Sequence, residues 1–234
     1  MKVIKGIFRW LFILCFPVFI LTASLAIAFN CQWIFNYGFE KYDVSKTTGL
    51  SEQNLSKIAT SWTSYINSGK EYWDITIEQD GSSFVLFTSE EQTHFKDVKE
   101  LVLLDYIVLS LTFILCIGYV CYRLRSRTLA SKNRLAKDII IGSLISIGWI
   151  LVLGAASLIN FDALFLQMHY LVFTNEFWYS EGYMLELFPG GFWYDAAFIS
   201  IGLMTILILI SLITGIIMLR SKHEEQINHT NIKY

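Results

Sequence analysis

Long apolar runs alternate with polar segments along the chain, and this alternation is the strongest pattern in the sequence. It predicts membrane-spanning helices at about residues 8–29, 99–121, 138–158 and 196–219. A run of about 20 residues can cross a hydrocarbon core of roughly 30 Å as a helix. Each run must be helical there, because lipid offers no hydrogen-bond partner to free backbone amides and carbonyls.

The first apolar run also has some features of a cleavable signal peptide. Basic residues precede it, and residues 26–28, Ala-Ile-Ala, resemble a cleavage site. Signal-peptide cores are usually only about 7–15 residues long, whereas this run is longer. We therefore favour a first transmembrane helix and keep cleavage as the alternative.

The distribution of basic residues predicts the orientation in the membrane. Residues 1–10 hold three lysines or arginines and residues 123–137 hold six, whereas residues 161–195 hold none and carry five acidic residues. Basic residues concentrate in cytoplasmic loops. Both termini, the loop 122–137 and the tail 220–234 are thus predicted to be cytoplasmic, and residues 30–98 and 159–195 to form an extracytoplasmic cap.

Local patterns predict the elements of this cap. Apolar residues at helical spacing predict a helix over residues 54–68. Strand-like segments at 71–78 and 82–87 flank Asp80-Gly81, which is a strong hairpin signal. A new helix is expected to begin near Thr88 with a capping box, formed by Thr88 and Glu91 or by Ser89 and Gln92, and to continue into the second span.

The composition agrees with a membrane protein. The 234 residues are 54% hydrophobic and 16% charged, with a formal net charge of −2. Such an apolar excess excludes a soluble domain, and no basic face remains that would bind nucleic acid. The expected fold is an all-α membrane protein in a single domain, 1–234: a four-transmembrane-helix bundle with a small α+β extracytoplasmic cap that contains a β-hairpin and an aromatic interfacial helix.

His94 lies just after the predicted helix start at Thr88. At about 100° per residue, His94, Asp97 and Asp105 fall on one helix face. A carboxylate one turn from an imidazole can fix its tautomer and raise its basicity, so Asp97 is a candidate orienting residue. Asp105 lies about one turn inside the second span, where an ionisable group faces either a polar cavity or an interhelical hydrogen bond. Both readings of Asp105 stay open.

His169 lies in a segment, 161–173, that is too apolar for an exposed loop and predicts an interfacial or re-entrant helix. Phe165, His169 and Phe173 are one turn apart, which puts the imidazole on an aromatic stripe. A histidine in such surroundings is more often a core residue than a catalyst, so composition leaves its role open. No third ligand accompanies the two histidines, and no metal site is predicted.

Two sequence elements resemble one known family. Residues 87–99 carry the pattern FTxxExxHxxDVK, which includes His94 and Asp97. Residues 165–178, followed by Leu187-Phe188-Pro189 and Phe192-Trp193, resemble a second signature. Both are similar to elements of the lipoprotein intramolecular transacylase (Lit) family of bacterial integral membrane proteins, and the resemblance covers nearly the whole chain in order.

The resemblance implies an enzyme, an acyltransferase. Family members move the sn-2 acyl chain of an S-diacylglyceryl-cysteine to the α-amino group of that cysteine, which gives the lyso-form lipoprotein. The family histidines match His94 and His169, which would act as general base and acid without an acyl-enzyme, with Asp97 and Asp105 in support. The residues expected to line the substrate pocket are Phe165, Phe173, Asn175, Trp178, Phe188 and Trp193.

The implied partners are diacylglyceryl lipoproteins and membrane lipid, with no cofactor, no nucleic acid and no obligate protein partner. The implied location is the bacterial cell membrane, with the active site on its extracytoplasmic side. An alternative is a non-catalytic membrane binding or accessory protein whose cap binds a partner. A small transporter is disfavoured, because spans three and four carry almost no polar residues from which to build a pathway.

Overall fold

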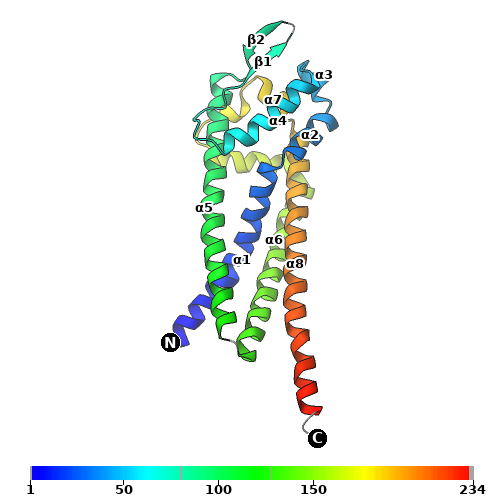
Figure 1. Cartoon of the computed structure of the whole chain (residues 1–234). Coiled ribbons are helices and arrows are strands. Elements are labelled where there is room, and N and C mark those ends of the chain that lie inside the picture. Colours follow the sequence, from blue (N-terminus) through cyan, green and yellow to red (C-terminus); the bar gives the residue numbers. More distant parts are fainter. Residues whose placement is uncertain (1, 80, 127, 232–234) are drawn as a thin grey trace. The chain divides into compact units, whose positions relative to one another are not determined.

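The computed structural model describes residues 2–79, 81–126 and 128–231, with the backbone alone for Lys2 and residues 221–231. The predicted turn residue Asp80, Arg127 of the basic loop and the end of the tail therefore lie outside the described residues. Figure 1 labels the main elements. In chain order they are α1 (Lys2–Asn30), α2 (Gln32–Lys41), α3 (Val44–Thr48), α4 (Glu52–Ile66), β1 (Thr76–Gln79), β2 (Ser82–Val85), α5 (Ser89–Arg125), α6 (Leu129–Val172), η1 (Phe177–Tyr179), α7 (Tyr183–Leu187) and α8 (Gly190–Asn231).

Four helices within the described chain are long and apolar enough to cross a membrane. They lie at Val3–Asn30, Ser89–Arg125, Leu129–Val172 and Gly190–Arg220. The prediction of four long apolar helices is thus confirmed. Each helix also continues beyond its apolar run, because the polar residues that flank the runs are themselves helix formers.

The chain divides into two compact units. The first comprises residues Met1–Ser24, Ile107–Leu153 and Ile201–Tyr234, and the second comprises Leu25–Tyr106 and Gly154–Ser200. Each unit has its own hydrophobic cluster. In the first unit the cluster includes Phe12 and Phe16 of α1, Tyr119 of α5, Leu135 of α6 and Met204 of α8.

A buried carboxylate connects three helices of the first unit. Asp138 of α6 has no exposed side-chain surface, and its Oδ1 lies 2.7 Å from Nε of Arg9 on α1. Its Oδ2 accepts a 2.5 Å hydrogen bond from the Tyr119 hydroxyl of α5, which in turn accepts one from Nε of Arg123. Both oxygens of the buried charge are therefore satisfied, as burial requires.

The second unit packs the shorter elements around an aromatic cluster. The Trp73 ring lies 5.1 Å from Trp62 of α4 and 4.8 Å from both Phe87 and Phe95. The sequence predicts a strand that already includes residues 71–75, but the observed hairpin pairs only Thr76–Gln79 with Ser82–Val85. In this register Ile77 lies opposite Phe84. The strand starts only at Thr76 because Trp73 turns into this cluster, where its Nε1 donates to Ser61.

Helix α5 begins with the first of the two predicted capping boxes. Thr88 Oγ1 accepts from the Glu91 N–H, and Glu91 Oε2 accepts from the Thr88 N–H at 2.8 Å. Phe95, one turn later, is buried in the aromatic cluster. The cap and the cluster together fix where α5 begins and which face it turns inward.

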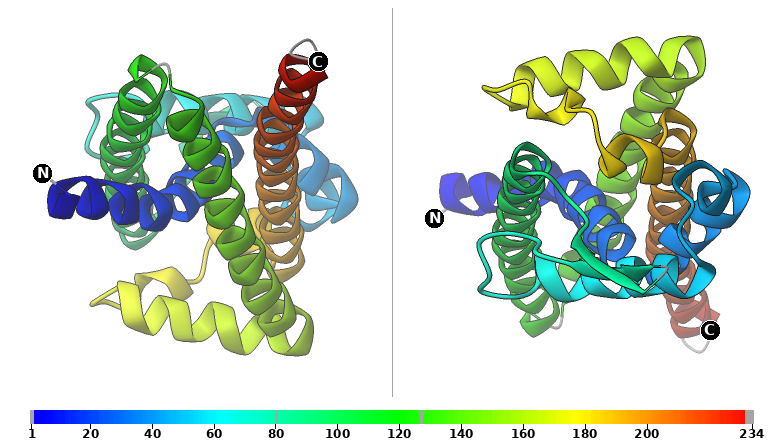
Figure 2. Two further views of the ribbon diagram at one scale, coloured as in Figure 1. Left: turned by 90° about the horizontal axis from the view of Figure 1, so that it is seen from below. Right: turned by 90° about the horizontal axis from the view of Figure 1, so that it is seen from above.

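Helix α6 contains a break at Asn160. Its backbone there is non-helical, with φ −162° and ψ 87°. The Asn160 Oδ1 accepts a 3.0 Å hydrogen bond from the Ala163 N–H, so Asn160 caps a second helical segment over 161–172. Figure 2 shows the ribbon turning within this helix. The segment predicted as an interfacial helix is thus a separate helical stretch that presents His169.

We expect Asp138→Ala to destabilise the protein by about 3–5 kcal/mol, because Arg9 would keep a partly buried charge without a partner. Thermal unfolding of the detergent-solubilised protein measures this. Glu71→Gln is the matched control, since it removes an exposed pair with Lys96 and exposed pairs contribute little. Equal stabilities of the two variants would contradict a structural role for Asp138.

Candidate functional site

The second unit brings His94 and His169 together. Their rings lie 6.2 Å apart, centroid to centroid, at an interplanar angle of 25°. His94 comes from the second turn of α5 and His169 from the segment of α6 after the Asn160 break, and both are over nine-tenths buried. Two residues that the sequence singled out separately thus belong to one site.

Aromatic rings surround His169 on several sides. Phe165 lies 4.2 Å from the imidazole, Trp178 of η1 lies 5.0 Å from it, and Phe173 lies 5.3 Å from it. Phe173 also lies 4.9 Å from His94, edge to face. The helical spacing of residues 165, 169 and 173 accounts for two of these contacts, whereas Trp178 arrives through the fold of the following loop.

The other predicted pocket residues lie farther out. Trp193 contacts Phe165 at 6.0 Å and so belongs to a second layer of rings behind His169. Phe188 is buried in the hydrophobic cluster of the second unit, against Phe35 and Phe39. Its ring also lies 5.9 Å from Trp193, so Phe188 packs behind the second layer of rings.

A hydrogen bond determines the tautomer of neutral His169. Its Nδ1 lies 2.8 Å from the Phe165 carbonyl oxygen. A carbonyl oxygen can only accept, so Nδ1 carries the proton and donates it. In the neutral imidazole Nε2 then holds a free lone pair. Burial lowers the pKa of His169, which lies outside the predicted spans, so this neutral form is favoured at neutral pH.

His94 has a different hydrogen-bonding environment. Its Nδ1 is buried and has no hydrogen-bond partner among the described residues. Burial, reinforced by the neighbouring His169 and partly opposed by Asp97, lowers the pKa of His94 to about 4. A proton on Nδ1 would leave a buried N–H without an acceptor, whereas Nε2 is not among the buried atoms that lack a partner. We therefore assign the proton of neutral His94 to Nε2.

The two acidic candidates on α5 do not bond to the histidines. Asp97 Oδ2 accepts a 2.9 Å hydrogen bond from the amide of Asn175, and no described hydrogen bond joins Asp97 to His94. Asp105 has one buried carboxylate oxygen, Oδ2, to which no described residue donates. Asp97 thus acts on the site through the loop that carries Asn175, and through its charge.

The family model for the lipoprotein intramolecular transacylase Lit matches residues 10–193. The chain belongs to the Lit family. Among solved structures, it is similar to the membrane-integral Lit from Bacillus cereus, with 13% identity and a TM-score of 0.78 over 96% of this chain and 100% of that one. A histidine-to-arginine variant of that protein matches at 14% identity and a TM-score of 0.77, with 96% of each chain covered. A search of curated proteins gives no match.

Glu91, which the capping pattern singled out, has a second contact in this Lit-family protein that the sequence did not reveal. Its side chain is fully buried, and Oε2 completes the capping box with Thr88. Its other oxygen, Oε1, accepts a 2.6 Å hydrogen bond from the Met184 N–H, 93 residues away in sequence. The capping pattern identified one of these bonds, but no local signal points to the second.

Three hydrogen bonds fasten the loop after α6 and the first turn of α7 to the start of α5. Glu90 accepts from the Ser180 hydroxyl, Glu91 from the Met184 N–H, and Asp97 from Asn175. Asn175 also accepts from the Phe177 N–H, which starts η1 and positions Trp178. The acidic side chains of α5 therefore hold the aromatic wall against His169.

No cluster of three or more His, Cys, Asp or Glu side chains that could hold a metal occurs within residues 3–79, 81–126 and 128–220, where side chains are described. The chemistry that this candidate site offers is that of two buried imidazoles lined by aromatic rings. One presents an acceptor nitrogen and the other a donor.

We expect Gly182→Ala to destabilise this protein by about 1–3 kcal/mol, because the added Cβ would overlap the Glu91 carboxylate and force it from its backbone partners. Gly69→Ala is the control, since a Cβ there meets no atom within 4 Å. Thermal unfolding of both variants in one detergent tests this. An equal unfolding temperature for the two variants would show that the Glu91 contact does not hold the loop.

Proposed function

We propose that this protein transfers an acyl chain within bacterial lipoproteins, from the sn-2 position of the S-diacylglyceryl-cysteine to its α-amino group. Membership of the Lit family supports the general activity. The observation that carries the finer proposal is the pairing of His94 with His169, both buried and 6.2 Å apart, inside a wall of aromatic rings.

In this proposal His169 is the base. The α-amino group attacks the ester carbonyl carbon, and its proton passes to the free Nε2 of His169 as the carbon–nitrogen bond forms. The tetrahedral intermediate then breaks its bond to the sn-2 oxygen, and His169 returns the proton to that oxygen. One imidazole thus moves one proton from nitrogen to oxygen, so the step needs no net acid or base.

His94 has the complementary role of hydrogen-bond donor. Its Nε2–H would stabilise the negative charge that develops on the carbonyl oxygen. The low pKa of His94 suits this role, because the ring remains neutral while His169 gains and loses the proton. A donor in dry surroundings stabilises such a charge more than it would in water.

No acyl-enzyme is required, since donor ester and acceptor amine belong to one molecule and positioning supplies much of the rate. The wall of Phe165, Phe173 and Trp178 would exclude water, which limits loss of the acyl chain to hydrolysis. The predicted orientation, with both termini cytoplasmic and this site extracytoplasmic, would present the histidines at the face where lipoprotein N-termini lie.

We expect His94→Ala and His169→Ala to leave the protein inserted in the membrane and to lower lyso-form production by at least about 10²-fold. The measurement is tandem mass spectrometry of the N-terminal peptide of a co-expressed diacyl lipoprotein, which distinguishes N-acyl from O-acyl isomers of equal mass. Gln167→Ala, an exposed position on the same helical segment, is the control. Full conversion by both alanine variants would leave the non-catalytic binding protein as the better reading.

Glutamine variants separate the two roles. His94→Gln keeps an N–H donor and should retain more activity than His94→Ala, whereas His169→Gln lacks a base and should match His169→Ala. The reverse order would exchange the assignments.

Asp97→Asn should lower turnover less than loss of His94, because the asparagine carbonyl can still accept from the Asn175 amide. Asp97→Ala should lower it further. The Asp97→Ala, Asn175→Ala double variant should lose less than the two single changes added together, since both single changes remove the same Asp97–Asn175 bond. The same peptide assay measures all three. An unchanged rate in Asp97→Ala would show that this bond does not position the site.

A further inference from the structure

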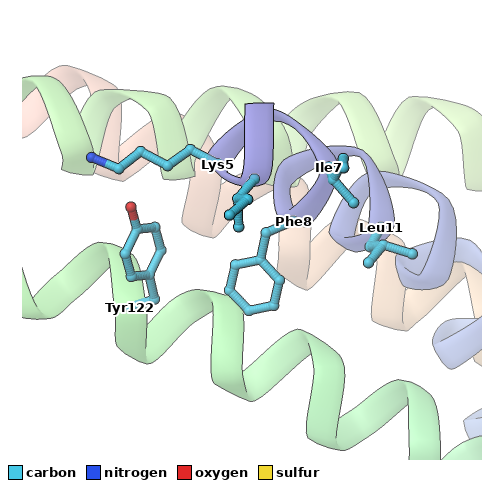
Figure 3. Close-up of a pocket in the computed structure, with 6 residues that line it drawn as sticks. Lys5, Ile7, Phe8, Leu11 and Tyr122 are labelled. Atoms are coloured by element: carbon cyan, nitrogen blue, oxygen red, sulfur yellow. The ribbon is translucent and has the colours of Figure 1, made fainter. Parts of the chain in front are cut away.

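The first unit contains an apolar groove that the proposed reaction does not use. It has a volume of about 460 Å³ and is lined by Ile4, Lys5, Ile7, Phe8 and Leu11 of α1 and by Tyr122 of α5. Such a volume falls within the usual range for small-ligand sites. Figure 3 shows the Phe8 ring and the Leu11 side chain along the groove.

One end of the groove is polar. Figure 3 shows the Lys5 ammonium extending toward the side on which the Tyr122 hydroxyl lies. Neither group has a hydrogen-bond or ion-pair partner in the described part of the chain. The Arg123 guanidinium lies 5.6 Å from the Tyr122 ring, which adds positive charge nearby. No acidic residue lines the groove, so its charge complements an anion.

The surface around the groove is one that lipid covers. On the same helix Val3, Trp10 and Leu14 are 74%, 56% and 60% exposed. An apolar helix with such exposed side chains is stable only against hydrocarbon. The molecule that reaches this groove therefore comes from the bilayer, and it must combine an apolar chain with an anionic head.

We propose that this groove binds one anionic phospholipid of the bilayer, with an acyl chain along Ile7, Phe8 and Leu11 and the headgroup phosphate at Lys5 and Tyr122. The ammonium supplies the charge and the hydroxyl a second donor to the phosphate oxygens. Basic residues at helix ends beside apolar grooves are a general means of selecting anionic lipids. The site is independent of the histidine pair and does not rest on the transacylase reaction.

The test is native mass spectrometry of the full-length protein in detergent, supplemented with phosphatidylglycerol or phosphatidylcholine of identical acyl chains. We expect one phosphatidylglycerol to be retained in preference to phosphatidylcholine. Lys5→Gln should weaken that retention by about fivefold, because one lysine charge near a membrane surface contributes about that much. Lys5 is exposed and unpaired, so this change does not endanger the fold.

Two matched controls accompany the variants. Lys137→Gln removes another exposed lysine of the first unit and should leave retention unchanged. Ile7→Trp should fill the groove and abolish retention of both lipids, whereas Ile217→Trp, at a similarly exposed position on α8, should not. If Ile7→Trp fails to fold, the comparison of Lys5→Gln with Lys137→Gln by itself tests whether the groove binds the anionic lipid.

Three results would overturn the proposal. Equal retention of the two lipids by the unmodified protein would remove the headgroup preference. Equal retention of phosphatidylglycerol by Lys5→Gln and Lys137→Gln would show that Lys5 does not bind the headgroup. Retention of a diacyl lipopeptide in place of phosphatidylglycerol, lost in Ile7→Trp, would assign the groove to the substrate.

Discussion

Glu91 places a carboxylate inside the hydrophobic cluster of the second unit, where it accepts hydrogen bonds from the Thr88 and Met184 N–H groups. A buried carboxylate is costly unless its oxygens are satisfied, and backbone N–H groups are donors that only one arrangement of the two segments supplies. The same side chain therefore caps the start of α5 and fastens the first turn of α7 to it. The wall of the histidine site depends on this connection, because Trp178 lies in the loop between the Asn175 and Met184 attachments.

Burial then determines the chemistry that the histidines can perform. His169 is packed against Phe165, Phe173 and Trp178, and His94 against Phe173 and His169 itself. Both imidazoles are buried, and both pKa values fall below the ordinary value. The hydrogen bond from His169 to the Phe165 carbonyl and the orphaned Nδ1 of His94 differ, so the two rings are not equivalent. This difference is what allows one ring to accept a proton while the other donates a hydrogen bond.

Asp138 has a similar structural role in the first unit. There too a fully buried carboxylate has both oxygens engaged, by Arg9 and by Tyr119. In apolar surroundings van der Waals packing alone discriminates weakly between helix registers, and a charge with only one satisfactory set of partners discriminates strongly. In both units a buried acidic residue thus joins segments that are distant in the sequence.

The sequence by itself determined the four apolar helices, the hairpin of β1 and β2, the capping of α5 by Thr88 and the aromatic spacing of Phe165, His169 and Phe173. These features depend on residues within one or two helical turns or one strand pair, so local periodicity and capping patterns reveal them. It also singled out both histidines, and the family match confirms the resemblance on which their proposed roles rest. Only the tertiary structure decided that the two rings meet, that Asp97 bonds to Asn175 rather than to His94, and that Glu91 reaches Met184. The two hydrogen bonds join residues 78 and 93 positions apart. Long-range partners of a polar side chain are set by packing, which leaves no periodic trace in the sequence.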